Sequence, residues 1–133
     1  MPIIYVEQYT REEIRANRNQ VYVFGDNFAR RGFGGQAREA RHEPNTIGIP
    51  TKRAPTYADD AYLTDADFQE WLEVAHSDFD SIRRALRDGR TIVLPVAGLG
   101  TGLAQLPERA PRIYQHIVDF IHACEDWQQQ AAK

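Results

Sequence analysis

The segment Val21-Tyr-Val-Phe-Gly-Asp-Asn-Phe-Ala-Arg-Arg-Gly-Phe-Gly-Gly-Gln-Ala37 contains the pattern that decides the fold. Its apolar start, Val21–Phe24, is typical of a β-strand, and Gly25 ends that strand. The glycine-rich stretch Gly32–Gly35 then leads into an expected helix over about Gln36–Arg41. The segment therefore indicates one strand–loop–helix unit of an α/β chain.

The rest of the chain repeats this alternation of strands and helices. Further strands are expected at Ile3–Val6, Thr46–Ile49 and Thr91–Leu94. Helices are expected from the capping box at Thr10–Glu13 to about Ala16, along the apolar stripe from Phe68 to Leu86 after Thr64, and from Pro111 onward. Ser77-Asp78 is a place where the long helical region can divide into two helices. This alternation predicts a three-layer α/β/α fold with a mostly parallel central sheet, formed by residues 1–133 as a single domain.

Composition restricts the class of partner and the compartment. The chain has 133 residues and a net charge of −3, whereas proteins that bind bulk nucleic acid need a basic surface. A local basic patch is nevertheless formed in the sequence by Arg30, Arg31, Arg38 and Arg41. The single cysteine, Cys124, cannot form an internal disulfide, which favours a reducing compartment. Because the chain has no signal-peptide pattern and no apolar run of about 18 residues, we expect a soluble cytoplasmic protein without a membrane partner.

Three polar or glycine-rich loops follow the carboxyl ends of expected strands, after Phe24, Ile49 and Leu94. In parallel α/β sheets, ligands bind outside this edge. Glycines let the main chain approach a phosphate closely, and the N–H groups of such loops and of helix starts bind anions. The two glycine-rich loops therefore predict a phosphate site, although their spacing is neither the Walker A pattern nor the dinucleotide fingerprint. The alternative is that the glycines only turn the chain. The ligand-binding residues expected on these loops are Gly32, Gly34, Gly35, Gln36, Gly98, Leu99, Gly100, Thr101 and Gly102.

Two further groups of residues bring side-chain chemistry to the same edge. Asp26 and Asn27 either hold a ribose hydroxyl or orient a water, or else they stabilise a turn. Lys52, which follows Thr51, either pairs with phosphate or acts as a nucleophile towards a sugar carbonyl, the alternative being a solvated loop lysine. Tyr57 either stacks on a base or ribose or packs its own loop. The histidines and the cysteine lack metal-ligand spacing, so neither a metal site nor a cofactor is expected.

These motifs resemble those of the macrodomain family. Residues 27–37 resemble the family's first glycine loop, and Thr91–Leu103 resembles its late strand and second loop. The segment Ile49–Tyr57 is similar to one branch, which contains the terminal ADP-ribose protein glycohydrolase and the antitoxin macrodomain that removes ADP-ribose from DNA. Lys52 matches the catalytic lysine of that branch, whereas Ala104 stands where its partner aspartate is expected.

The resemblance extends over about Val21–Pro107 and implies a macrodomain-like fold that binds ADP-ribose or a derivative. It implies a diphosphate across Gly32–Gly35 and Gly98–Gly102, a distal ribose on Asn27, and the anomeric carbon of that ribose near Lys52. The implied activity is that of an ADP-ribosyl glycohydrolase, which removes ADP-ribose from a protein or a nucleic-acid end.

The missing aspartate leaves three functional hypotheses. In the first, Asp26 supplies the catalytic group from the other loop, because hydrolysis needs a group that assists departure or activates water. In the second, which Ala104 favours, the protein binds or senses the nucleotide without turnover. In the third, it binds a macromolecular partner and the glycines serve as turns. The loop assignment predicts that Gly34→Val or Gly100→Val abolishes ligand binding without unfolding the chain.

Overall fold

The central sheet has four parallel strands in the computed structural model, which describes residues 3–131. The strands are β1 (Ile3–Val6), β2 (Gln20–Asn27), β3 (Thr46–Lys52) and β4 (Thr91–Pro95), in the spatial order β1-β4-β2-β3. Each neighbouring pair is parallel, which confirms the predicted type of sheet.

β2 and β3 extend beyond the strands that the sequence predicted. Asp26 pairs with Pro50, and Asn27 pairs with Lys52 across a bulge. The polar residues that were expected in loops therefore lie at the last positions of two neighbouring strands, where sheet pairing fixes their main chain.

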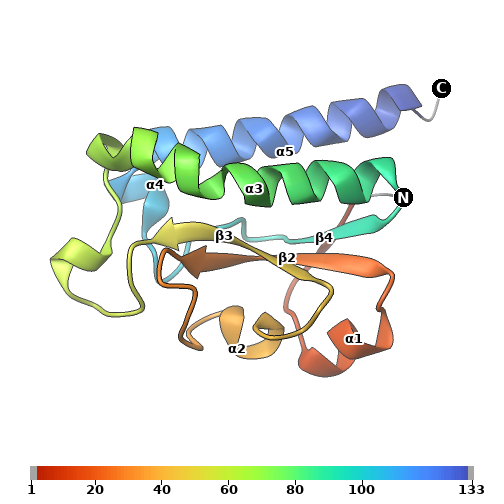
Figure 1. Ribbon diagram of the computed structural model, residues 1–133, viewed down its shortest axis with the longest axis horizontal. Helices are drawn as coiled ribbons and strands as arrows, with labels where there is room; N and C mark the ends of the chain where they lie inside the picture. The colour runs from red at the N-terminus through yellow and green to blue at the C-terminus, as the bar shows by residue number, and fades with distance from the viewer. Residues whose placement is uncertain (1–2, 132–133) are drawn as a thin grey trace.

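Helices cover both faces of the sheet (Figure 1). α1 (Arg11–Ala16) and α2 (Ala37–Ala40) lie on one face, and α3 (Phe68–Arg87) and α5 (Pro111–Ala131) lie side by side on the other. The short helix α4 (Leu106–Arg109) precedes α5, and the 3₁₀ turns η1 (Asp59–Ala61) and η2 (Asp65–Asp67) lie between β3 and α3. This arrangement confirms the three-layer α/β/α architecture. No helix within residues 3–131 is both long enough and apolar enough to cross a membrane.

The alternating side chains of β2 hold the layers together. Val21 and Val23 are buried in the larger core with residues of α3 and α5, whereas Tyr22 and Phe24 are buried in a smaller core with residues of α1 and α2. Successive side chains of a strand point to opposite faces, so one strand contributes to both cores.

α3 is one continuous helix, so the predicted break at Ser77-Asp78 is wrong. Ser77 is exposed to water, and Asp78 forms an ion pair with Arg30 at 2.7 Å. The polar groups of both side chains are therefore satisfied without a break in the helix. Trp71 in the same helix is fully buried, and its Nε1 donates to the main-chain oxygen of Pro50 at 2.7 Å. Packing of α3 against the sheet thus overrides the modest helix propensity of serine and aspartate.

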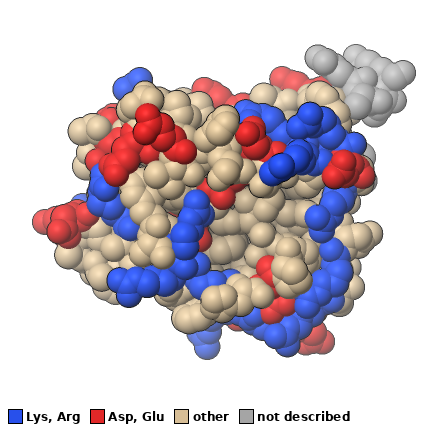
Figure 2. Space-filling view, viewed as in Figure 1, with Lys and Arg blue, Asp and Glu red and all other residues tan. Residues whose placement is uncertain are grey.

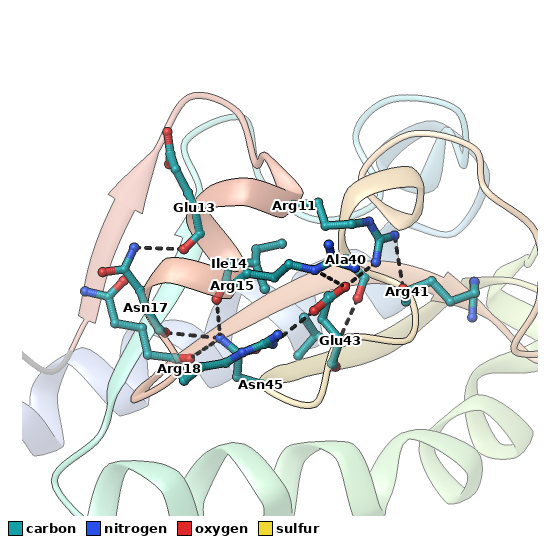
Figure 3. A network of polar contacts seen from close by, with 12 residues as sticks. Arg11, Glu13, Ile14, Arg15, Asn17, Arg18, Ala40, Arg41, Glu43 and Asn45 are labelled. Carbon is teal, nitrogen blue, oxygen red and sulfur yellow. Dashed lines mark hydrogen bonds and ion pairs between the residues drawn. The ribbon is translucent and has the colours of Figure 1, made fainter.

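A buried polar cluster around Glu43 fastens α1 to the segment between α2 and β3 (Figure 3). Glu43 forms ion pairs with Arg11, Arg15 and Arg18. Asn45 donates to the main-chain oxygens of residues 14, 17 and 20 and accepts a hydrogen bond from Arg18. The cluster therefore closes the end of the molecule at which β2 and β3 begin.

The onward connections of the neighbouring strands β2 and β4 leave towards opposite faces of the sheet. β2 leads to α2 on one face, and β4 leads through α4 to α5 on the other. Such a topological switch point opens a crevice at the carboxyl ends of the strands. Both predicted glycine-rich loops begin at this crevice.

Candidate functional site

A cleft of about 330 Å³ lies at the carboxyl ends of the central strands. It is bordered by the first glycine loop (residues 28–36, between β2 and α2) and the second glycine loop (residues 96–105, between β4 and α4). The predicted site residues that line it are Asp26, Asn27, Gly32, Gly34, Gly35, Gln36, Thr51, Lys52, Tyr57, Gly98, Gly100, Thr101 and Gly102. The fold thus brings together three segments that are far apart in the sequence.

Leu99 is the one predicted site residue whose side chain lies elsewhere. Only 2% of the residue is exposed, and its side chain is part of the larger apolar core. The flanking Gly98 and Gly100 have positive φ angles of 92° and 76°, which let the chain reverse around Leu99. Leu99 therefore anchors the second glycine loop to the core.

The first glycine loop presents unpaired main-chain donors. Within the described part of the chain, the N–H groups of residues 31–36 have no protein acceptor. Gly32 has a φ of +95°, and a Cβ at this position would lie 2.7 Å from Cβ of Pro55, so only glycine fits there. Because α2 has only four residues, an anion would meet these loop N–H groups rather than the dipole of a long helix.

The second glycine loop has the same property. The N–H groups of residues 99–104 find no acceptor among residues 3–131. A Cβ on Gly100, whose φ is +76°, would lie 2.8 Å from a methyl group of Leu106, so Gly100→Val is expected to disturb the fold, contrary to the sequence-based prediction. A Cβ on Gly34 would meet only Cδ1 of Leu103, at 3.3 Å, so this position tests the cleft with little strain.

The carboxylate of Asp26 is buried and paired. Only 4% of its side chain is exposed, and its Oδ1 lies 2.5 Å from Nη2 of Arg41 and accepts the main-chain N–H of Asn27 at 2.8 Å. Arg30 lies 3.6 Å from Oδ2. These partners compete with the predicted role of Asp26 as a proton-transferring group, which requires access to the ligand. Arg41, which the sequence placed only in a basic patch, lines the cleft beside it.

Asn27 carries a buried acceptor without a partner. Its Nδ2 donates to the main-chain oxygen of Arg31 at 2.8 Å, which fixes the orientation of the amide. Its Oδ1 finds no hydrogen-bond donor among the described residues, although only 7% of Asn27 is exposed. A buried polar atom left unpaired costs about 1–3 kcal/mol. Asn27 lines the cleft, so a hydroxyl group of a ligand can satisfy this oxygen.

Lys52 lies on the wall of the cleft at the end of β3. Its Nζ donates to the main-chain oxygen of Thr56 at 2.6 Å and lies 4.5 Å and 5.2 Å from the ring centres of Tyr62 and Tyr57. Burial lowers the pKa of Lys52 below its ordinary value, and the positive charge of Arg109 lowers that pKa further. The amine therefore loses its proton more easily than a solvated lysine, as a nucleophilic role requires.

The cleft is cationic although the whole chain has a net charge of −3. Among the described residues that line it, Asp26 is the only carboxylate, against Arg31, Arg41 and Lys52. Acidic side chains of the face in Figure 2 gather mainly around η1 and the start of α3. Within residues 3–131, no group of three or more His, Cys, Asp and Glu side chains is placed to hold a metal ion. The charge of the cleft thus suits an anionic ligand.

Exposed apolar side chains line the mouth of the cleft. Phe33, Tyr57 and Leu103 are 56%, 75% and 49% exposed, and all three line the cleft. Exposed apolar groups that gather in one place commonly mark a binding surface. Only Tyr57 was predicted from the sequence. Phe33 and Leu103 could have been found from the sequence, because each is an apolar residue next to a glycine of its loop.

The fold and the cleft define a small parallel α/β protein with a cationic crevice at its switch point. The chain belongs to a family of unknown function, DUF7831, whose family model matches residues 4–120. The match includes both glycine loops and every residue that lines the cleft. No curated protein and no solved structure matches the chain.

Proposed function

We propose that the cleft binds a nucleotide of the ADP-ribose type, with a diphosphate, a free sugar hydroxyl and a base. The observation that carries the proposal is that two kinds of unpaired groups meet in one cationic cleft. Rows of main-chain N–H donors from both glycine loops suit phosphate oxygens. The buried Oδ1 of Asn27 accepts hydrogen bonds only, so it suits a hydroxyl and not an ionised phosphate. A ligand that satisfies both must carry a hydrogen-bond donor as well as phosphate oxygens, and a sugar phosphate carries both.

The apolar mouth supports the presence of a base. The exposed rings of Phe33 and Tyr57 offer flat apolar surface, on which a nucleobase can stack. The resemblance to macrodomains supports ADP-ribose as the ligand with these parts, either free or attached to a protein or a nucleic acid.

Calorimetric titration tests this proposal. We expect ADP-ribose to bind more tightly than ADP, ribose 5-phosphate or pyrophosphate. ADP lacks the second ribose beyond the diphosphate, whose hydroxyl groups we assign to Asn27, ribose 5-phosphate lacks the diphosphate and the base, and pyrophosphate lacks both sugar and base. ADP-ribose should also raise Tm, and raise it further as its concentration increases above Kd. Absence of binding by the wild-type chain would contradict the proposed function.

The variant Gly34→Val tests the loop assignment. A Cβ at residue 34 approaches Leu103 alone, so the added side chain narrows the cleft while the fold is retained. We expect ADP-ribose binding to be lost and Tm to stay close to that of the wild type. Ala123→Val, a similar enlargement at an exposed position of α5, is the matched control and should bind normally. Wild-type affinity of Gly34→Val would refute the assignment.

A glycohydrolase activity is a second candidate, favoured by the position and the lowered pKa of Lys52 in the cleft. Two observations favour binding without turnover: Ala104 lines the cleft where the resembling branch has an aspartate, and Asp26 is paired with Arg41. Chromatography after incubation with ADP-ribosylated protein and ADP-ribosylated DNA ends distinguishes the two. Release of ADP-ribose that Lys52→Ala abolishes indicates an enzyme, whereas a ligand that stays bound and unaltered indicates a sensor.

A further inference from the structure

A buried arginine lies directly behind the first glycine loop. Only 6% of Arg41 is exposed, and its Nε donates to the main-chain oxygen of Gly32 at 2.6 Å. Its Nη2 donates to the main-chain oxygen of Arg31 at 3.3 Å and pairs with the carboxylate of Asp26 at 2.5 Å. One guanidinium group thus holds two consecutive carbonyl groups of the loop and one carboxylate from β2.

The direction of these carbonyl groups determines the direction of the neighbouring donors. In a trans peptide unit, the C=O and N–H groups point in opposite directions, and the described chain contains no cis peptide. The carbonyl of Arg31 shares a peptide unit with the N–H of Gly32, and the carbonyl of Gly32 shares one with the N–H of Phe33. When Arg41 holds both oxygens, both N–H groups are turned away from it.

Asp26 in turn holds Arg41 in place. Its Oδ1 also accepts the N–H of Asn27, so the carboxylate is fixed relative to β2. The neighbouring strand leaves room for it: a Cβ on Gly48 would lie 2.7 Å from Oδ2 and 2.9 Å from Cβ of Asp26. The sheet, Asp26, Arg41 and the loop therefore form one connected chain of contacts.

We propose that Arg41 and Asp26 are positioning residues that orient the N–H groups of the first glycine loop towards the anion. Arg41 acts through the loop carbonyls, and Asp26 acts through Arg41. In this role Asp26 is neither an acid nor a base in the reaction. The inference rests on the proposed function only for the choice of ADP-ribose as the probe.

The test compares Asp26→Asn, Arg41→Gln and the double variant with a matched control. Arg38→Gln removes an exposed arginine of α2, so it has the same charge change as Arg41→Gln but outside the cleft. We expect each single variant to weaken ADP-ribose binding by about 10- to 100-fold, as loss of supporting partners commonly does in binding sites. The double variant should bind no worse than Arg41→Gln, because both changes break the same connection. Arg38→Gln should bind like the wild type.

Two alternative roles of these residues predict other effects of Asp26→Asn on ADP-ribose binding. If the charge of Arg41 acted directly on the anion, Asp26→Asn would free that charge and strengthen binding. If Asp26 were a catalytic acid or base, Asp26→Asn would leave affinity unchanged and abolish turnover. Either result overturns the proposal.

Backbone NMR relaxation keeps the test independent of ADP-ribose. We expect the order parameters of the N–H groups of residues 31–35 to fall from about 0.85 to below about 0.6 in Asp26→Asn and Arg41→Gln, but not in Arg38→Gln. If the wild type does not bind ADP-ribose, this ordering still supports the positioning role while the proposed function fails. Unchanged order parameters would overturn the positioning role. Where Asp26→Asn does not stay folded, Arg41→Lys replaces it, because an ammonium group keeps the charge but cannot reach both carbonyls and the carboxylate.

Discussion

Two carboxylates on the same side of the sheet are equally buried and both paired with arginines, but they lie in different parts of the fold. The side chains of Asp26 and Glu43 are 4% and 5% exposed, and both are paired with arginines. Asp26 lies at the end of β2 and lines the cleft, whereas Glu43 lies where β3 is about to begin. Their partners differ in what they hold: Arg41 holds a loop, and the arginines of Glu43 hold α1 and the turn that follows it.

An asparagine close in sequence to each carboxylate shows which of the two sites is complete without a ligand. Asn45, next to Glu43, uses its amide fully, with donors on three main-chain oxygens and its Oδ1 on Arg18. Asn27, next to Asp26, leaves its Oδ1 unpaired within the described chain. A buried network in which every polar group is hydrogen-bonded is explained by its structural role. A buried polar atom that is left unpaired at a cleft indicates a position where a ligand supplies the missing hydrogen bond.

The largest effect on stability is expected from Glu43→Gln. The change leaves Arg11, Arg15 and Arg18 around a neutral amide, and removing one partner of a buried charge cluster is strongly destabilising. We expect Glu43→Gln to lower Tm more than Asn45→Ala or Asn27→Ala does, with unchanged ADP-ribose affinity for the folded protein. Glu12→Gln, an exposed glutamate of α1, is the control and should leave Tm unchanged.

The pH dependence of this effect has a definite sign. Burial alone would raise the pKa of Glu43, but hydrogen bonds from Arg11 and Arg18 and the charge of Arg15 outweigh it, so the pKa is lowered. A carboxylate with a lowered pKa stabilises the fold above the ordinary carboxylate range, and this contribution is lost as the pH falls through its folded pKa. Urea unfolding at pH 7 and at about pH 3 should therefore show a larger difference in the free energy of unfolding between wild type and Glu43→Gln at pH 7 than in acid. An equal difference at both pH values would contradict the assignment.

Replacing the two asparagines should have effects of intermediate size, on stability for Asn45 and on ligand affinity for Asn27. Asn45→Ala removes several satisfied hydrogen bonds and should lower the free energy of unfolding by about 2–4 kcal/mol without changing ligand affinity. Asn27→Ala removes an unpaired oxygen together with one hydrogen bond to Arg31, so the free energy of unfolding should change by less than about 1 kcal/mol. ADP-ribose affinity should fall about tenfold in Asn27→Ala, as expected for the loss of one ligand hydrogen bond. If Asn27→Ala bound normally, the unpaired oxygen would have no role in recognition.

Local sequence patterns were sufficient for most of the fold and much of the cleft. The strand segments Val21–Phe24 and Thr91–Leu94 have continuous apolar character, and the glycines that follow them identify the loops at the carboxyl edge. Because parallel strands end at the same edge, the meeting of these loops followed from the predicted sheet.

The misses depend on tertiary contacts that no local pattern contains. Leu99 lies between the two glycines of a loop, and only the reversal of the chain shows that its side chain enters the core. The helix through Ser77-Asp78 continues because of its packing against the sheet. Arg41 stands three residues after the exposed Arg38 of α2, and nothing in the local sequence distinguishes the two. The burial of Arg41 depends on its pairing with Asp26 of β2.

The smallest effect concerns Lys52 on the wall of the cleft and its neighbour Arg109. Nζ of Lys52 and the guanidinium group of Arg109 both lie against the ring of Tyr62, at 4.5 Å and 3.8 Å from its centre. Burial is the larger cause of the lowered pKa of Lys52, and the charge of Arg109 is the smaller one. Arg109→Gln should therefore raise the pKa of Lys52 slightly and leave it below the ordinary lysine value.

NMR titration of the lysine side chains measures this shift, because the chain has only one other lysine, Lys133. Arg112→Gln, in the next helix, removes an equal charge that lies over Phe68 and should leave the pKa of Lys52 unchanged. A decrease in the pKa of Lys52 in Arg109→Gln would mean that the charge of Arg109 does not lower this pKa, and would contradict the assignment. Equal shifts in both variants would mean that the net charge of the surface, and not the nearby charge of Arg109, makes the smaller contribution to the lowered pKa.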